Sequence, residues 1–246
     1  MNIGFFAPSY HRPQKSTTQT LFPFVKIVCK ESESKEYAEN GNDIVVCPDS
    51  AQGNVCRVRN WILDTFLPQY DCVVLMDDDY HGIIRTQDTN RHYLNADELE
   101  EFAESAAILC KEWGFYFWGL NPLCDKGSYR EYTPFSTLQF IGGPFQAFLQ
   151  GCELRYDEKL NLKEDYDMTL QNLKRYGGCL RFNFMSYRVK QAEQEGGCAM
   201  QRNTEEEKRQ LNMLKIKWGG AVIGIDNTSK RGFDFNPILK TPLKGV

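Results

Sequence analysis

Short apolar runs alternate with helix-prone segments over the first third of the chain, and this alternation restricts the possible folds more than any other feature. The polar stretch Glu31–Glu39 separates the second run from the third, and apolar residues recur every three to four positions after Gly53. Apolar strands separated by helices are typical of a mostly parallel sheet with helices on both faces. We therefore predict an α/β, Rossmann-like fold. The apolar runs are Ile3–Ala7, Phe24–Cys29, Asp43–Cys47 and Cys72–Met76.

The second half of the chain predicts a mixture of helices and strands. Asn95, followed three residues later by Glu98, has the pattern of a helix N-cap, and a second helix is expected from about Lys163 to Tyr176. The segment Gly142-Gly143-Pro144 has a strand-like run on each side and therefore predicts a tight turn between two paired strands. The further elements expected here are the strands Phe115–Leu120, Thr137–Ile141, Phe145–Leu149 and Leu180–Val189, a loop over Glu193–Arg209 and a helix over Lys208–Trp218.

The length of 246 residues fits one domain, which we divide into residues 1–94, residues 95–207 and a C-terminal appendage of residues 208–246. A hydrophobic content of 41% is enough for a core and argues against a disordered chain. Apolar runs are all shorter than the ~18 residues of a membrane span, and the first residues lack a signal-peptide pattern. We therefore expect a cytoplasmic protein that does not contact membranes.

The nine cysteines are expected to be reduced thiols of the core. Their number is odd, none forms a C-x-x-C pair, and Cys29, Cys47 and Cys72 lie inside apolar runs. This pattern favours neither a disulfide framework nor a structural zinc site.

The net charge of −4 is unevenly distributed along the chain. Residues 208–246 contain eight basic and two acidic residues, a balance of +6, which leaves residues 1–207 at −10. Such a tail is either an ordinary solvated surface or a patch that meets an anionic partner such as nucleic acid.

Three consecutive aspartates, Asp77, Asp78 and Asp79, follow the apolar run Cys72–Met76. Side chains alternate along a strand, so Asp77 and Asp79 are expected on one side and Asp78 on the other. A solvated acidic turn is the simple interpretation. However, the carboxyl ends of parallel strands are where such sheets bind ligands, and carboxylates suit Mg²⁺ or Mn²⁺. We therefore predict a divalent metal site with Asp77 and Asp79 as ligands.

A second acidic pair, Glu164-Asp165, opens the helix expected at Lys163–Tyr176. Acidic residues stabilise a helix N-terminus through the helix dipole, which is one sufficient explanation. The other is that one carboxylate deprotonates a hydroxyl group of a substrate. We expect Asp165 to have this catalytic role, with Glu164 as the second candidate.

Together these segments resemble GT-A glycosyltransferases, which carry a D-x-D motif like Asp77-Asp78-Asp79 after a strand of their nucleotide-binding half. More narrowly, the chain resembles the TET-associated glycosyltransferases of bacteriophages and some eukaryotes. The likeness rests on Ala7–Pro13, on Pro48–Gly53 with Val58-Arg59-Asn60, and on Met76–Asp79. It implies a GT-A-like fold in which residues 1–94 bind a nucleotide-sugar and residues 95–207 form a mixed, acceptor-side half.

The resemblance also implies roles for individual residues. The donor would be a UDP-sugar, with the metal ion bridging the aspartates and the diphosphate. Arg57 or Arg59 would contact phosphate near a helix N-terminus, and Asp49 would lie near the uracil or ribose. A surface position for Arg59 is the alternative. The remaining residues assigned to the donor site are Pro8, Ser9, Tyr10, Arg12, Gly53 and Asp78.

Many GT-A enzymes add a later histidine to the metal site, and here the sequence departs from that pattern. The histidines are His11, His81 and His92, all in the first half of the chain. Water, another carboxylate or the diphosphate is therefore expected to complete the metal's ligands. His81 is a possible substitute, and an exposed position is the alternative for it.

For the acceptor, the resemblance implies a 5-hydroxymethylpyrimidine base in DNA, modified in the host cytoplasm if a phage encodes the protein. Such a base has to be extruded from the helix or offered in a single strand. Aromatic side chains next to cations would suit stacking against it. The candidates are Tyr129, Tyr132, Trp218 and Phe235, with Trp118 and Phe233 expected to be core or turn residues.

Three other interpretations remain open from the sequence. The acceptor could be a glycan, a lipid-linked sugar or a protein. The aspartates could serve a nucleotidyltransferase or a nuclease, although two-metal nucleases usually gather more carboxylates. The chain could also be a binding module without catalysis.

Overall fold

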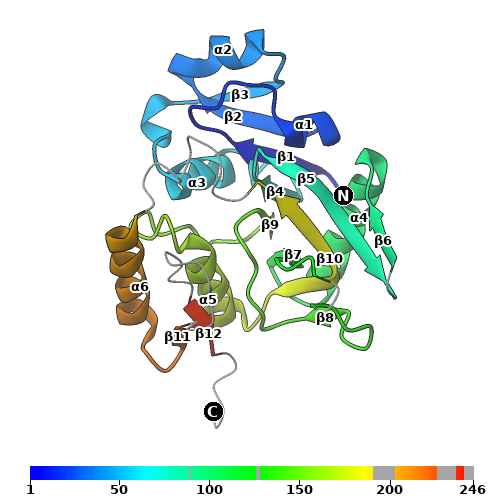
Figure 1. Ribbon diagram of the computed structural model, residues 1–246, viewed down its shortest axis with the longest axis vertical. Helices are drawn as coiled ribbons and strands as arrows, with labels where there is room; N and C mark the ends of the chain where they lie inside the picture. The colour runs from blue at the N-terminus through cyan, green and yellow to red at the C-terminus, as the bar shows by residue number, and fades with distance from the viewer. Residues whose placement is uncertain (89, 126–127, 191–202, 226–236, 241–246) are drawn as a thin grey trace.

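A sheet of ten strands forms the centre of the molecule, with helices on both faces (Figure 1). The computed structural model describes residues 1–88, 90–125, 128–190, 203–225 and 237–240. The strands of the sheet are β1 (Ile3–Pro8), β2 (Lys26–Lys30), β3 (Ile44–Cys47), β4 (Cys72–Met76), β5 (Tyr80–Gln87), β6 (Asn90–Tyr93), β7 (Phe117–Asn121), β8 (Phe135–Ser136), β9 (Phe145–Leu149) and β10 (Leu180–Val189). The helices are α1 (Thr17–Leu21), α2 (Ser34–Glu39), α3 (Val55–Phe66), α4 (Ala96–Glu112), α5 (Glu164–Tyr176) and α6 (Thr204–Trp218).

The sheet has a parallel half and a mixed half. Its order is β3-β2-β1-β4-β9-β7-β10-β5-β6, with β8 beside β10, and β3, β2, β1 and β4 run parallel. Strand β9 is antiparallel to both β4 and β7, β7 and β10 are parallel, and β5 is antiparallel to β10 and β6. This is an α/β fold of the GT-A-like, Rossmann type, as predicted.

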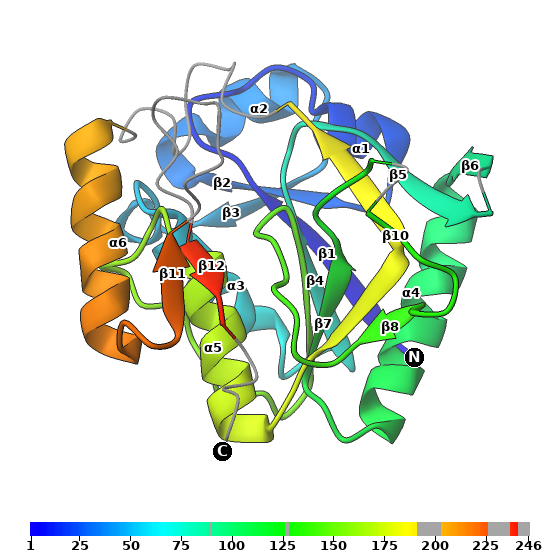
Figure 2. The ribbon, with the colours of Figure 1, turned by 60° about the horizontal axis from the view of Figure 1, so that its bottom comes forward.

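Alternate residues of the central strands enter two separate cores. On β1, Phe5 and Ala7 pack with Phe22 just after α1 and with α2 and α4, whereas Phe6 packs on the opposite face with α3 and α5. A third, smaller core joins α5 to α6 and to the two-stranded sheet of β11 (Ile223–Ile225) and β12 (Pro237–Leu239), which lie beside α5 in Figure 2. Among the described residues, no helix is long and apolar enough to cross a membrane.

The strand predicted over Thr137–Ile141 is wrong. Residues Thr137–Gln139 form bends, and β9 pairs with β4 and β7 instead of with this segment. All five residues of β9 are buried, so it is a central strand whose partners lie far away in the sequence. The tight turn at Gly142-Gly143-Pro144 indicated a local hairpin. This prediction failed because a sequence pattern does not reveal strand partners that are distant in the chain.

Several other elements differ from the prediction. Helix α6 begins at Thr204 and not at Lys208, because the Asn203 side chain caps it by accepting from Glu206 N. Residues 193–202 of the predicted loop Glu193–Arg209 lie outside the described part of the chain, and its residues 204–209 belong to α6. The five-residue helix α1 and the β5–β6 hairpin were not predicted. The eight described cysteines are all free, and seven of them are buried, which fits the predicted core thiols.

Candidate functional site

The aspartate triplet lies beside the end of β1, because β1 and β4 are parallel neighbours whose carboxyl ends share one edge of the sheet. Asp78 is 8% exposed and faces the turn after β1. Its carboxylate accepts hydrogen bonds from Ser9 Oγ at 2.5 Å and from Arg12 Nη1 at 3.0 Å. The buried Tyr37 hydroxyl holds the same turn, since it lies 2.9 Å from Ser9 Oγ and accepts from Arg12 N at 3.0 Å.

Helix α1 fixes the backbone of the triplet, a role that the sequence did not reveal. Ser16 Oγ donates to the carbonyl of Asp78 and Thr18 Oγ1 donates to the carbonyl of Asp77, both at 2.7 Å. Ser16 is also the N-cap of this helix. A Ser-Thr-Thr sequence is a recognisable helix start, but its contact with residues about sixty positions away is not.

Arg59 connects the triplet to the acidic start of α5. This side chain is 3% exposed, so it is not a surface residue. It contacts Asp77 Oδ1 at 3.3 Å and Glu164 Oε1 at 3.1 Å. It also donates to the carbonyl of Gly143 at 2.9 Å. Two carboxylates that are 87 residues apart in sequence therefore share one buried cation.

The segment Gly142-Gly143-Pro144 forms the wall between these carboxylates. Gly143 N donates to Asp165 Oδ2 at 3.1 Å, and Pro144 O accepts from Asp77 N at 3.2 Å. A Cβ atom on Gly143 would lie 3.2 Å from Glu164 Oε1 and 3.6 Å from Asp165 Oδ2. A side chain at this position would therefore press on Glu164 and touch Asp165.

Four carboxyl groups at this site have raised pKa values. Burial is the largest cause for each of them, and neighbouring carboxylates add to it for Asp77, Asp79 and Glu164. The pKa of Asp79 is raised to about 7 and that of Glu164 to about 8. Asp77 keeps 36% of its side-chain surface exposed, yet protein atoms surround its carboxylate closely enough for burial to raise its pKa as well. Such clustering of perturbed groups is typical of functional sites.

The donor set fits a hard divalent cation, with the protein as only part of its shell. Asp79 Oδ1 is buried and has no hydrogen-bond partner within the described part of the chain. A carboxylate oxygen in this state is stabilised by a cation or a proton. No group of three His, Cys, Asp or Glu residues suited to hold a metal ion exists among the residues that the structure describes. His81 is exposed, and His11 and His92 pair with Glu33 and Glu98.

The other predicted donor residues lie around this cluster and not inside it. Asp49 follows β3 at the same sheet edge and accepts from Ser32 N at 3.1 Å. Arg57 is exposed and pairs with Glu158 at 3.1 Å. Gly53 has a φ of +82°, a left-handed conformation that explains a glycine just before the N-cap of α3. Pro8 ends β1, and the Tyr10 ring lies 5.2 Å from Lys30 Nζ.

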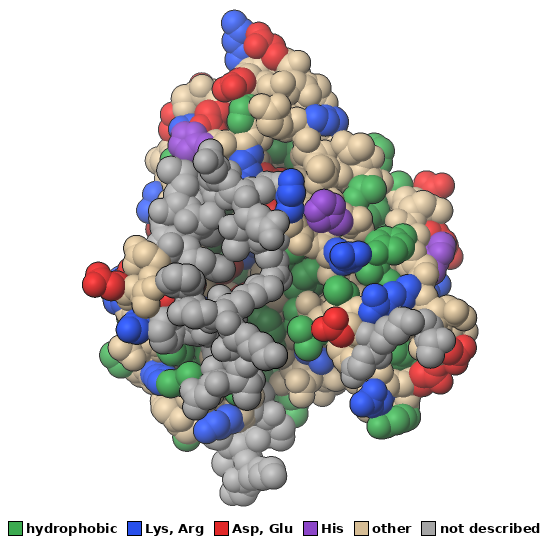
Figure 3. Space-filling view, in the orientation of Figure 1, with side chains coloured by type: hydrophobic (Ala, Val, Ile, Leu, Met, Phe, Trp, Pro, Cys, Tyr) green, Lys and Arg blue, Asp and Glu red, His purple; other side chains and the backbone are tan. Residues whose placement is uncertain are grey.

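Two surface hollows elsewhere do not mark the site. One is lined by residues of β5 and by Tyr129 and Glu131, and the other by Trp113 and residues 135–139. Neither includes a member of the carboxylate cluster. On the face shown in Figure 3, the described Lys and Arg side chains are scattered among acidic ones and form no continuous patch.

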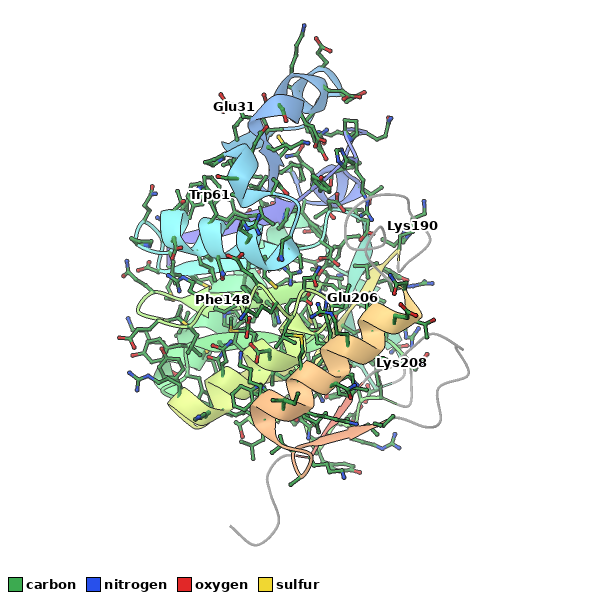
Figure 4. All side chains as sticks on the ribbon, turned by 90° about the vertical axis from the view of Figure 1, so that its left-hand side faces the viewer. Glu31, Trp61, Phe148, Lys190, Glu206 and Lys208 are labelled. Atoms are coloured by element: carbon green, nitrogen blue, oxygen red, sulfur yellow. The ribbon has the colours of Figure 1, made fainter. Side chains whose placement is uncertain are left out.

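Helix α6 lies against α5, as Figure 4 shows from the side, and holds its first turn. Lys163 Nζ and Glu207 Oε2 are 2.5 Å apart, with side-chain exposures of 2% and 3%. Asp167, the third acidic residue of α5, is fully buried and accepts from Trp218 Nε1 at 2.8 Å. Trp218 is therefore held within the molecule, and Phe233 and Phe235 lie outside the described residues.

Comparison with known protein families decides what kind of protein carries this site. The family model of TET-associated glycosyltransferases matches residues 6–197. The chain belongs to this family. Its matched region includes the aspartate triplet, Arg59 and the start of α5, and the membership makes the chain a glycosyltransferase. A comparison with curated proteins gave no match.

The crystal structure of a mycobacterial protein supports the fold of this glycosyltransferase. It matches with a TM-score of 0.51 and 10% identity, over 97% of this chain and 83% of that one. The crystal structure of A197 from STIV matches with a TM-score of 0.42 and 14% identity, over 77% of this chain and 85% of that one. At these identities the likeness concerns the fold alone.

Proposed function

We propose that this protein transfers a sugar from a UDP-sugar to a hydroxyl group, with a divalent metal ion, and that the acceptor is a 5-hydroxymethylpyrimidine base in DNA. The observation that carries the proposal is the gathering of Asp77, Asp79, Glu164 and Asp165 with Arg12 and Arg59 at one sheet edge. This edge is where Rossmann-like sheets bind nucleotides.

The donor would lie along the ends of β1, β3 and β4. Arg12, which is 3.0 Å from Asp78 and 3.7 Å from Asp79, is placed to meet the diphosphate. The turn Ser9–Arg12 and Asp49 would border the nucleoside. Asp77 and Asp79 would hold Mn²⁺ or Mg²⁺, which supplies Lewis-acid stabilisation of the departing diphosphate.

Asp165 is the better candidate for the base that deprotonates the acceptor. Its two carboxylate oxygens accept from Gly143 N and Tyr166 N, and such bonds favour the ionised form that a base needs. Glu164 has a pKa raised to about 8, so much of it is protonated at neutral pH. Two neighbouring acids in unlike environments commonly have unlike roles.

Thermal unfolding with UDP, GDP, CMP and their sugars, with and without Mn²⁺, tests the donor and the metal. A ligand that binds the native state raises the melting temperature, so UDP and Mn²⁺ together should raise it most. Asp79→Asn should remove the part of the shift that depends on Mn²⁺. Asp64→Asn, an exposed residue paired with Arg155, is the matched control and should keep it. Absence of any response to nucleotides with metal would contradict the proposal.

Incorporation of labelled sugar into DNA tests the acceptor. Hydroxymethylated DNA should be labelled and unmodified DNA should not, with one UDP released for each sugar transferred. Labelling of glycans or proteins in place of DNA would move the acceptor to that class while keeping the donor site. Release of pyrophosphate, or cleavage of DNA, would instead assign the aspartates to nucleotidyl transfer or a nuclease.

A further inference from the structure

Tyr187, on β10, is a buried tyrosine whose hydroxyl group has no hydrogen-bond partner among the described residues. The side chain is 4% exposed, and its ring lies 6.1 Å from that of Tyr80. The hydroxyl therefore still has its full capacity to donate and accept a hydrogen bond within the described part of the chain.

The other buried tyrosines of the described chain use their hydroxyl groups within the protein. Tyr80 donates to Pro144 O at 2.7 Å, and Tyr156 donates to Gln146 Oε1 at 2.5 Å. Tyr37 holds Ser9 and Arg12 in the turn after β1. Buried tyrosine hydroxyls normally find a partner, so a spare one calls for a ligand that supplies it.

The position of this hydroxyl is set by the wall that carries the two acids of α5. A Cβ atom on Gly142 would lie 2.3 Å from the Tyr187 oxygen, and one on Gly143 would lie 3.6 Å from Asp165 Oδ2. Gly142 and Gly143 are consecutive residues, so the hydroxyl and the Asp165 carboxylate each border one of two neighbouring positions on the same backbone segment. Because residue 142 is a glycine, the Tyr187 hydroxyl has room beside it, and any side chain at this position would fill that space.

The surroundings of Tyr187 keep its hydroxyl protonated. Burial raises the pKa of Tyr187 well above 10, and Asp165, Asp77 and Tyr166 raise it further, while Arg181 opposes them. At neutral pH the group is therefore a hydrogen-bond donor and not a base. A neutral donor on the same side of the molecule as a carboxylate that influences it electrostatically is suited to a substrate hydroxyl, which can accept one bond and donate another.

We propose that the Tyr187 hydroxyl binds the acceptor, by donating a hydrogen bond to the oxygen whose proton Asp165 removes. This rests on the proposed function. In the transfer, the acceptor O–H bond breaks and its proton passes to Asp165. The same oxygen forms a bond to the anomeric carbon, and the bond from that carbon to UDP breaks with its electron pair leaving on UDP.

Tyr187→Phe tests this inference, with Tyr80→Phe as the matched control. Tyr187→Phe removes no internal hydrogen bond, so its melting temperature should equal or exceed that of the wild type. Its response to UDP and Mn²⁺ should be unchanged, while kcat/KM for the acceptor falls about tenfold, as expected for one lost hydrogen bond. Tyr80→Phe loses the bond to Pro144 O and should unfold at a lower temperature.

A second pair of variants tests the position of the hydroxyl. Gly142→Ala should destabilise the protein, because the new methyl group meets the Tyr187 oxygen. Tyr187→Phe in the same chain should restore much of the lost stability, since the next ring atom, Cζ, is 3.6 Å from the point where that methyl carbon would lie and only the 3.3 Å approach to Pro122 Cβ remains tight. Transfer activity should stay low in the double variant.

Three outcomes would overturn the inference. The first is wild-type acceptor kinetics in Tyr187→Phe. The second is loss of the UDP response in that variant, which would place the hydroxyl at the donor. The third is a wild-type protein that transfers no sugar to any acceptor, in which case the proposed function fails as well.

Discussion

Arg59 is a buried cation that faces carboxylates on two sides, Asp77 just after β4 and Glu164 on α5. Arg12 compensates Asp78 and, at 3.7 Å, Asp79. The raised pKa values of Asp77, Asp79, Glu164 and Asp165 show that these two arginines do not balance the site at neutral pH. Protons neutralise part of the remaining negative charge, and the proposed metal ion would compete with them for the same oxygens.

This excess charge predicts how stability depends on pH in metal-free protein. The pKa of Glu164 rises from 4.5 to about 8 on folding, so the folded state binds more protons between these values. Its stabilising contribution is full below about pH 4.5 and is lost as the pH rises towards 8, by at most ~1.4 kcal/mol per pH unit. Urea unfolding in EDTA from pH 5 to 8 should show this decline, and Glu164→Gln should make it shallower.

Glu206 supplies the control for that experiment. Hydrogen bonds from Arg209 and Gln210 lower its pKa to about 2, so its contribution is lost only as the pH falls below about 4.5. Glu206→Gln should therefore leave the slope between pH 5 and 8 unchanged, whatever it costs in stability. A wild-type protein that becomes more stable towards pH 8 would contradict the assignment of a protonated, buried Glu164.

At the scale of elements, helix α5, which begins with Glu164 and Asp165, depends on α6 for its first turn. Its N-cap residue, Lys163, makes no side-chain cap hydrogen bond, but Gln210 on α6 accepts from Leu162 N at 2.7 Å just before the helix. Lys163, the residue before the helix, is neutralised by Glu207 of α6. Further along α5, Asp167 binds Lys217 and Trp218. The last two residues of α6 therefore bind the helix that carries Glu164 and Asp165.

The buried pair Lys163–Glu207 gives a prediction for this contact. Glu207→Gln leaves the Lys163 charge without its partner and should lower the free energy of unfolding by about 3–5 kcal/mol. Replacing both residues with apolar ones of similar size, Lys163→Met with Glu207→Leu, should cost far less. Urea unfolding measures both. Glu153→Gln is the control, since it breaks an exposed pair with Arg175 and should cost about 0–1 kcal/mol. Equal costs for Glu207→Gln and Glu153→Gln would contradict this account.

Local patterns were enough to predict the elements that carry a signal in their own residues. The strands around Ile3–Pro8 and Cys72–Met76, the capped helix at Asn95 and the acidic start of α5 all followed from runs, periodicity or caps. The pairing of β9 did not, because its partners β4 and β7 are chosen by packing between distant segments. The positions of Gly143 and Tyr187 escaped for the same reason, since neither carries a local signal of the acids beside it.

At the scale of the whole molecule, the +6 balance of the tail overstates the charge it offers to a partner, because some of its basic residues form ion pairs within the structure. Of the basic residues in the tail, Arg209 binds Glu206, and Lys217 binds Asp157 and Asp167. Lys230, Arg231 and Lys244 lie outside the described residues. Part of the apparent +6 thus serves internal contacts and cannot also meet an anionic partner. An exposed cation nearer the site is Lys190, whose backbone N–H donates to Asp79 O at 3.3 Å (labelled in Figure 4).

If DNA is the acceptor, its binding should weaken steeply with salt, because cations that meet phosphates release counterions. We expect log K for single-stranded hydroxymethylated DNA to fall linearly with log salt, by about 0.7 for each phosphate contacted. Lys190→Gln should reduce that slope by the amount expected for about one phosphate contact. Lys35 on α2 is 87% exposed, and Lys35→Gln should leave the slope unchanged. Fluorescence anisotropy between about 50 and 200 mM salt measures the slopes. A slope near zero would exclude an electrostatic DNA site and favour a neutral acceptor such as a glycan. The carboxylates of the proposed site repel a DNA strand unless nearby cations compensate them, so binding of DNA requires such cations and therefore depends on salt.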